Sequence, residues 1–94
     1  MEVKQHNTEK NGHFYIEENG KTLAIMTYVY AGEHTFIIDH TEVKEGGEGK
    51  GLGKQLVHAA VEFARSKGYK ILPLCPFAKS LFDKLPEWSD VLAK

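Results

Sequence analysis

The chain has 94 residues, which suits one compact domain because domains usually contain about 100–150 residues. Hydrophobic residues make up 41%, aromatic residues 11% and charged residues 27% of it, a composition typical of a soluble globular domain and unlike that of disordered, collagen-like or membrane chains. The formal net charge of −1 argues against a nucleic-acid or membrane-surface binder driven by electrostatics. We expect residues 1–94 to form a single domain.

Targeting and metal signals are weak throughout the chain. No apolar run approaches the roughly 20 residues that span a bilayer, and the N-terminal MEVKQHNTEK lacks the apolar region of a signal peptide. We therefore expect a cytoplasmic protein. The lone Cys75 forms no internal disulfide or CxxC zinc site, and the five histidines have no metal-ligand spacing. No metal is expected.

Charge is distributed unevenly between the two halves. Residues 1–47 carry four lysines against eight acidic residues, net −4, whereas residues 48–94 carry eight basic against five acidic residues, net +3. An anionic ligand should therefore favour the second half. The acidic first half could attract a cationic partner.

Strands are expected over residues 3–10, 13–18, 21–30 and 34–43, which are rich in β-branched and aromatic residues. Asn19-Gly20 suits a type I′ hairpin turn between the second and third strands. Asn11-Gly12 offers a similar turn after the first, more polar strand, which we expect at the sheet edge. Both alternating sets of side chains on the third strand are apolar or nearly so, which predicts a central strand covered on both faces.

The hydrophobic period then changes to that of a helix. Apolar residues recur at spacings of three and four at Leu52, Leu56, Ala59, Ala60, Phe63 and Ala64. Gly68 is placed to end this helix. A short buried strand follows over residues 69–74, with Pro73 marking an edge or a strand end.

A second helix is expected over residues 76–85. Pro76 suits its first turn, Cys75 would be its N-cap, and Pro86 would stop it. The predicted fold is a mixed α/β (α+β) domain, an antiparallel meander followed by helix, strand and helix.

The segment EGGEGKGLGK, residues 45–54, joins a strand to a helix and contains five glycines. Amides at a helix N-terminus bind phosphate, and Lys50 and Lys54 add positive charge. The alternative is a flexible surface loop without a ligand. A Walker A motif fails because Glu48 and Gln55 stand where Gly and Ser or Thr are needed, and no GxGxxG spacing is present.

The run from Glu48 to Gly53 continues directly into the helix and fits the pattern x-x-x-Gly-x-Gly. It resembles the acetyl-CoA pyrophosphate loop, R/Q-x-x-G-x-G/A, of the GNAT superfamily of N-acetyltransferases. With DHTEV at residues 39–43 and CPF at 75–77, the chain resembles the small acetyltransferase-like subfamily of minimal GNAT domains. The resemblance covers most of the chain and implies a truncated GNAT fold.

The resemblance also implies a cofactor, acetyl-CoA, and its contacts. The backbone around Val43 would pair with pantetheine, and the loop residues Glu48, Gly49, Lys50, Gly51, Leu52, Gly53 and Lys54 would hold the pyrophosphate. The second helix, around Phe77, Ser80 and Phe82, would border the thioester and the rest of CoA. Glu48 departs from the family pattern, since it replaces Arg or Gln with an acid, and it would weaken the binding without abolishing it.

Cys75 and His40 are the candidate catalytic residues. A thiol at a helix N-cap has a lowered pKa and an increased thiolate fraction, although a lone cysteine beside an apolar strand is also a common inert core residue. In the resembling subfamily this cysteine is a suspected catalytic residue, which would accept acetyl or lie beside the thioester. His40 could take the proton of an incoming ammonium, or could merely pack on its strand. Strand alternation places Asp39 on the opposite face from His40.

The resemblance implies an acetyl-CoA-dependent N-acetyltransferase acting on an amine of a small molecule or a protein lysine. The alternative is a CoA-binding or protein-interaction module with little or no catalysis, and a weaker one is a domain that binds nothing at the glycine loop. Ordinary GNAT domains continue into further strands that help to build the acceptor site. This short chain is therefore expected to have an open site, with low acceptor selectivity or with a partner chain completing it. Neither the acceptor nor the oligomeric state follows from the sequence.

Overall fold

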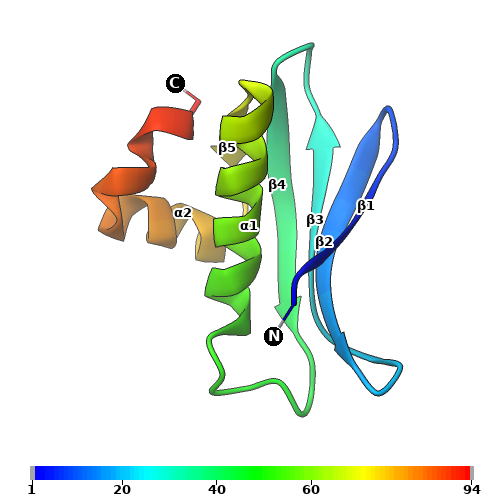
Figure 1. Ribbon diagram of the computed structural model, residues 1–94. Coiled ribbons are helices and arrows are strands. Elements are labelled where there is room, and N and C mark those ends of the chain that lie inside the picture. Colours follow the sequence, from blue (N-terminus) through cyan, green and yellow to red (C-terminus); the bar gives the residue numbers. More distant parts are fainter. Residues whose placement is uncertain (1, 94) are drawn as a thin grey trace.

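The computed structural model describes residues 2–93 and contains a five-stranded sheet with both α-helices on one face (Figure 1). The elements are β1 (Lys4–Asn7), β2 (Asn11–Glu18), β3 (Lys21–Tyr30), β4 (Thr35–Val43), α1 (Leu52–Lys67), β5 (Lys70–Pro73), α2 (Pro76–Lys84) and a 3₁₀ helix (Pro86–Val91). The predicted mixed α/β fold and its order of strands and helices are confirmed. The 3₁₀ helix was not predicted.

The five strands lie side by side in the order β1-β2-β3-β4-β5. Strands β1 to β4 form an antiparallel meander, and β5 pairs in parallel with β4 after the crossover through α1. Asn19 and Gly20 both have positive φ, 54° and 78°, as a type I′ turn requires. The sheet therefore begins with the polar edge strand that the sequence predicted, although β1 is shorter than expected.

The turn predicted at Asn11-Gly12 is wrong. Both residues lie inside β2, and the chain turns earlier, where the Thr8 hydroxyl donates to the Asn11 carbonyl over 3.0 Å. Gly12 has a different role, because a Cβ there would come within 2.4 Å of the Tyr28 hydroxyl oxygen. Glycine thus lets the Tyr28 side chain lie against the β2 backbone.

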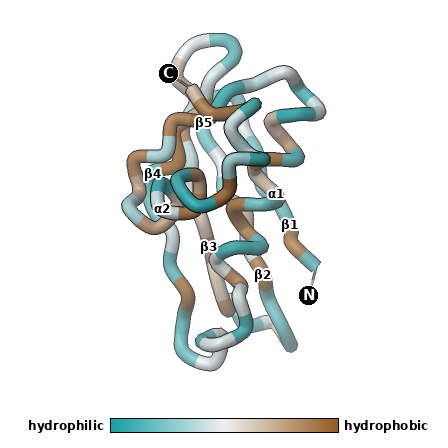
Figure 2. The backbone as a smooth tube through the Cα atoms, turned by 90° about the vertical axis from the view of Figure 1, so that its left-hand side faces the viewer, coloured by the Kyte–Doolittle hydropathy of each residue, from teal (hydrophilic) through white to brown (hydrophobic). Residues whose placement is uncertain are grey.

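The hydrophobic core lies between one face of the sheet and helix α1. Ala24, Met26 and Tyr28 of β3 are completely buried, and Phe36 and Ile38 extend the same face across β4. Helix α1 presents an inward stripe consisting of Leu52, Gly53, Leu56, Val57, Ala60, Val61 and Ala64. In Figure 2 hydrophobic residues follow the strands, whereas the loops at the lower end are hydrophilic to neutral.

The other face of the sheet has no helix over it within residues 2–93, so the prediction that β3 is covered on both faces is wrong. Ile25, Thr27 and Val29 on this face are only half-buried. Helices α1 and α2 stand on the same side of the sheet (Figure 1), where Gly53 of α1 lies close to the Phe77 ring of α2.

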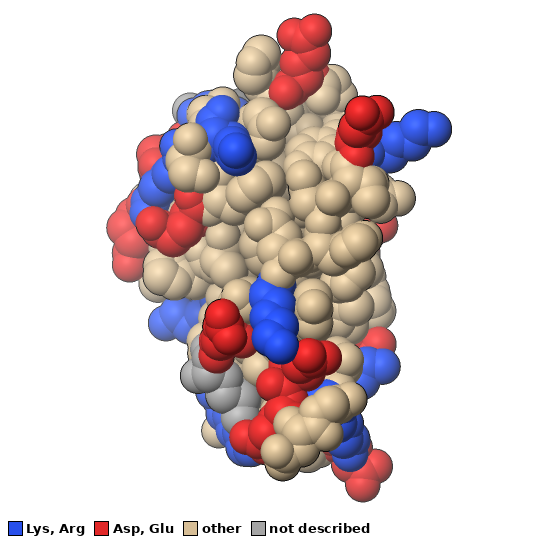
Figure 3. Space-filling model, turned by 45° about the vertical axis from the view of Figure 1, so that its right-hand side comes forward, with Lys and Arg blue, Asp and Glu red and all other residues tan. Residues whose placement is uncertain are grey.

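Acidic and basic side chains are interspersed at the sides and across the lower half of the face seen in Figure 3, and an uncharged area lies above its centre. This mixture gives that face no extended basic field of the kind that attracts nucleic acid. Within the described chain, every helix is too short or too polar to cross a membrane.

Candidate functional site

A cavity of about 410 Å³ opens where the glycine-rich loop meets α1 and α2. Its wall combines glycines with apolar side chains, one lysine and one glutamate. The lining residues are Val43, Gly47, Glu48, Gly49, Gly51, Leu52, Gly53, Lys54, Phe77 and Leu81. The structure thus brings β4, the loop and both helices together at one place.

The polar end of this cavity is the N-terminus of α1. Its N-cap, Gly51, is in the left-handed region with φ 69° and offers no side-chain cap, so the first amides of the helix have no partner within it. The helix dipole adds positive potential, and the Lys54 ammonium group adds a charge. This end of the cavity can accept a phosphate group.

The apolar end is formed by α2. Phe77 is 41% exposed, and its ring lies so close to Gly53 that a Cβ there would come within 2.6 Å of it. Leu81, one turn further along α2, continues this wall beside Val43 of β4. A ligand with an anionic part and an apolar arm fits such a cavity.

Glu48 folds back onto its own loop. Its Oε1 accepts a hydrogen bond of 2.8 Å from the amide of Gly46. Hydrogen bonds from its own amide, and then from those of Gly46 and Gly47, hold the pKa of the Glu48 carboxyl below its usual range. The carboxylate therefore stays charged beside the N-terminus of α1 while it orders the loop.

Strands β4 and β5 separate beside the cavity. Their pairing ends at Ile38 and Pro73, where the Ile38 carbonyl accepts from the amides of both Leu74 and Cys75, over 3.0 and 3.1 Å. Beyond this point the β5 side of β4 has no strand partner within residues 2–93. The backbone from residue 39 to 43 can therefore pair with an extended ligand there.

Cys75 lies at this separation as the N-cap of α2, as predicted, and is only 6% exposed. Its Sγ lies 3.4 Å from the Thr41 Oγ1 of β4. Burial raises the pKa of the Cys75 thiol, but hydrogen bonds from Thr41 and from the amides of Ala78 and Phe77 outweigh it and lower the pKa below the ordinary value. The site favours a thiolate in a sheltered position.

We expect Cys75 to be alkylated by iodoacetamide with a midpoint at lower pH than an ordinary thiol, whose pKa is about 8.5. A lowered pKa means that the thiolate, the reactive form, is present at lower pH. Thr41→Val removes one donor and should move the midpoint upward. The measurement is the alkylation rate by mass spectrometry across pH, with the denatured chain as the reference. An equal midpoint in folded and denatured protein would contradict the lowered pKa.

His40 leaves β4 on the uncovered face of the sheet. It pairs with Thr27, which belongs to that face, and its Nε2 lies 3.6 Å from Glu42 Oε1. The register of β4 shifts opposite Thr27 and Tyr28, and the Thr27 hydroxyl donates to Asp39 over 2.6 Å. Asp39 and His40 therefore share one face, so the expectation from simple alternation is wrong, because a bulge interrupts it.

The structure gathers most of the predicted binding residues and leaves some outside. Val43, Glu48, Gly49, Gly51, Leu52, Gly53, Lys54 and Phe77 line the cavity, whereas Lys50, Ser80 and Phe82 do not. The Ser80 hydroxyl donates to the Phe77 carbonyl over 2.8 Å, and the buried Phe82 packs against Trp88. Thr41 faces Cys75, whereas its chain neighbour His40 faces Thr27. The side chains of Cys75 and His40 therefore lie on opposite sides of β4.

Sequence reasoning missed Thr41 and Leu81. Thr41 lies on the same expected strand as His40, so strand alternation could have indicated that it faces the helices. Leu81 follows Phe77 by one helical turn, a spacing that signals a shared face. Residues 2–93 hold no group of three or more His, Cys, Asp or Glu side chains arranged to bind a metal.

Comparison with known proteins supplies an independent view of this arrangement. The family model of the GCN5-related N-acetyl-transferases matches residues 13–91. Protein NATD1 of Danio rerio is 30% identical over 79 residues, which cover 83% of this chain and 72% of that protein. Protein NATD1 of Xenopus tropicalis is 27% identical over 85 residues, covering 89% and 78% of the two chains.

A solution structure of a GCN5-like N-acetyltransferase candidate from Staphylococcus aureus is similar at a TM-score of 0.75 and 36% identity, covering 98% of this chain and 87% of that one. An aminoglycoside N-acetyltransferase, AAC(6')-Iy in complex with CoA, shares the fold at a TM-score of 0.65 and 12% identity, covering 89% of each chain. The same family is indicated by the separation of strands β4 and β5, by the glycine loop at the start of α1 and by the family match. The chain belongs to the GCN5-related N-acetyltransferase family.

Proposed function

We propose that this protein is an acetyl-CoA-dependent N-acetyltransferase that transfers acetyl to an amine of a small molecule or a protein lysine. The observation that carries the proposal is the cavity that joins the α1 N-terminus to the free edge of β4. Family membership supports acyl transfer, and the fold shared with a CoA complex supports the cofactor.

The residues along the cavity suit the chemical groups of CoA, and they follow one another in the same order as those groups do. Amides from residue 49 to 53 would hold the pyrophosphate, assisted by Lys54. The β4 backbone around Val43 would hydrogen-bond the pantetheine amides, and Phe77 and Leu81 would cover its apolar parts. When bound, the cofactor supplies an acetyl group activated as a thioester.

The two candidate catalytic residues would then have separate tasks. His40, on the uncovered face, would take the proton from an incoming ammonium, because only the neutral amine attacks. Cys75, on the cavity side of β4 with Thr41, would line the thioester. The opposite orientation of the two side chains favours direct transfer to the amine over a Cys-His pair.

Acceptor selectivity should be low because His40 lies on an open face of the sheet.

A cytoplasmic location suits the lone Cys75, since that compartment keeps thiols reduced. Fractionation of cells that produce the protein at native levels tests the location.

Glu48→Gln should strengthen CoA binding about three- to tenfold by removing a negative charge beside the phosphates. Glutamine keeps an oxygen that can accept from the Gly46 amide, so the loop should keep its shape. Titration calorimetry with CoA measures the change. Glu45→Gln alters the charge equally in the same loop but outside the cavity lining, and serves as control. Unchanged or weaker binding in Glu48→Gln would show that this charge does not oppose CoA.

Cys75→Ala should lower the transfer rate about tenfold and leave CoA affinity nearly unchanged, since in the proposed complex the thiol would contact only the thioester end of the cofactor. No acetyl-Cys75 adduct should accumulate when acetyl-CoA is supplied without an acceptor. Peptide mass spectrometry and steady-state rates measure both. An adduct that is consumed on adding amine would replace direct transfer with a covalent mechanism.

The proposed function is tested by incubating the protein with acetyl-CoA and a mixed panel of amines and lysine peptides, followed by mass spectrometry. An acetylated acceptor above the protein-free background supports it. Retention of CoA without any acetylated product would instead support a binding module, and no retention of CoA would refute both.

A further inference from the structure

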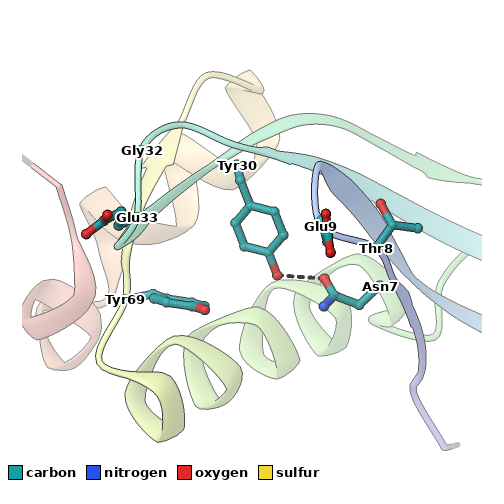
Figure 4. Close-up of a pocket in the computed structure, with 7 residues that line it drawn as sticks. All are labelled: Asn7, Thr8, Glu9, Tyr30, Gly32, Glu33 and Tyr69. Atoms are coloured by element: carbon teal, nitrogen blue, oxygen red, sulfur yellow. Dashed lines mark hydrogen bonds between the residues drawn. The ribbon is translucent and has the colours of Figure 1, made fainter.

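A second cavity, of about 600 Å³, lies at the opposite end of α1 from the glycine-rich loop. Three segments distant in sequence line it: the β1–β2 turn, the β3–β4 turn and the residue after Gly68. The lining residues are Asn7, Thr8, Glu9, Tyr30, Gly32, Glu33 and Tyr69 (Figure 4). Acetyl transfer as proposed above does not use this cavity.

Two tyrosine rings form its floor. Their centroids are 6.0 Å apart and their planes meet at 73°. The Tyr30 hydroxyl donates to Asn7 Oδ1 over 2.6 Å, and Tyr28 donates to the same oxygen over 2.7 Å, which holds the Tyr30 ring in place. Rings held in this way offer π faces that attract cations.

Two carboxylates flank these rings. Figure 4 places Glu33 beside Tyr69 on one side of Tyr30, and Glu9 on the other side. Within residues 2–93 neither carboxylate has a hydrogen-bond or ion-pair partner. Since they come from different turns, the two glutamates line the cavity from opposite sides of Tyr30.

The basic residues nearest in the sequence do not pair with the carboxylates of Glu9 and Glu33 within residues 2–93. Arg65 donates to both carboxylate oxygens of Asp90 over 2.9 Å, and the Lys70 ammonium donates to the Asp90 carbonyl. Both are therefore held on the side of the 3₁₀ helix. Lys10 and Lys67 do not line the cavity. The C-terminal end of α1, just before Tyr69, adds the negative end of its dipole.

We propose that this cavity binds a linear aliphatic diammonium ion. One ammonium group would pair with Glu9 and the other with Glu33, while the methylene chain and the charges lie over the tyrosine rings. A monoammonium ion would satisfy only one carboxylate, and an anion would be repelled. The site therefore separates ligands by the sign and the number of their charges.

The test is titration of the ligand-free protein with 1,4-diaminobutane and 1,6-diaminohexane, followed by amide NMR shifts and calorimetry. We expect saturable shifts centred on Asn7–Glu9, Gly32–Glu33 and Tyr69, at least about fivefold tighter than those of butylamine. Binding should weaken as salt is added. Shifts centred elsewhere, equal affinity for butylamine, or no saturation in the millimolar range would each overturn the proposal.

Variants test whether the diamine binds at this cavity. Glu9→Gln with Glu33→Gln should weaken diamine binding about tenfold, since both charges are lost, while Glu18→Gln with Glu45→Gln, an equal charge change elsewhere, should not. Tyr69→Phe should retain binding and Tyr69→Leu should lose most of it. If Tyr69→Leu does not fold, the variant with Glu9→Gln and Glu33→Gln tests the site alone, because both glutamates are exposed and their replacement should leave the fold intact. An equal loss in the control pair would mean general electrostatic attraction and overturn the site.

Discussion

Replacing Gly51 by glutamate is expected to weaken CoA binding at least about 100-fold. Gly51 is the N-cap of α1, in the left-handed region, and a Cβ there would meet nothing within 4 Å. A glutamate side chain would therefore extend from the cavity wall, beside the amides that we propose bind the pyrophosphate. Its carboxylate would repel the phosphates, and the backbone would add strain of about 1–2 kcal/mol.

Gly51→Asn separates these effects. Asparagine tolerates the left-handed region better than other residues and carries no charge, so it should keep most of the affinity. Calorimetry with CoA measures binding, and thermal unfolding checks that all variants are folded. If Gly51→Glu binds CoA like the natural chain, the phosphates do not lie at this helix N-terminus and the proposed function loses its main support.

Replacing His40 by glutamine is expected to lower the rate of acetyl transfer about 100-fold or more, the usual contribution of a general base. Glutamine keeps a polar side chain on the uncovered face but cannot take a proton. Because His40 does not line the cavity beside the glycine-rich loop, CoA affinity should remain near that of the natural chain.

The measurements are kcat and the KM for acetyl-CoA across pH, on the best acceptor found in the amine panel. His6→Gln, an identical change on the edge strand β1, is the control and should leave the rate nearly unchanged. Glu42→Gln should give a smaller loss, since Glu42 only approaches His40 Nε2, at 3.6 Å. An unchanged rate in His40→Gln would remove the base role, and a parallel loss of CoA affinity would make the residue structural.

Local patterns predicted the elements well because their causes lie within a few residues. The spacing of apolar residues in α1, the turn at Asn19-Gly20 and the N-cap position of Cys75 each depend on neighbours in the chain. The glycine loop was predicted as a phosphate site for the same reason, since a helix start and its free amides are local features. The structure adds Val57 and Val61 to the inward stripe of α1, a small rotation that is set by packing on the sheet.

Predictions failed where the local structure depends on a contact between residues that are distant in the sequence. Asn11-Gly12 has the composition of a turn, but Tyr28, in the next strand, lies over Gly12 and holds it in β2. Alternation placed Asp39 opposite His40, but the register shift against β3 brings both to one face. The apolar composition of β3 suggested two covered faces, whereas the helices all pack on one.

The order of elements and the family resemblance follow from the sequence, as does the prediction of a phosphate site in the loop, since each depends on adjacent residues. Which of these residues meet in space follows from the three-dimensional packing instead. It placed Thr41 beside Cys75, 34 positions away, turned His40 to the other face, and left Phe82 in the core. It also assembled the acidic, tyrosine-lined cavity from three distant segments. The physical reason is that helices and turns form from short-range forces, whereas a site depends on strand register and on the packing of whole faces.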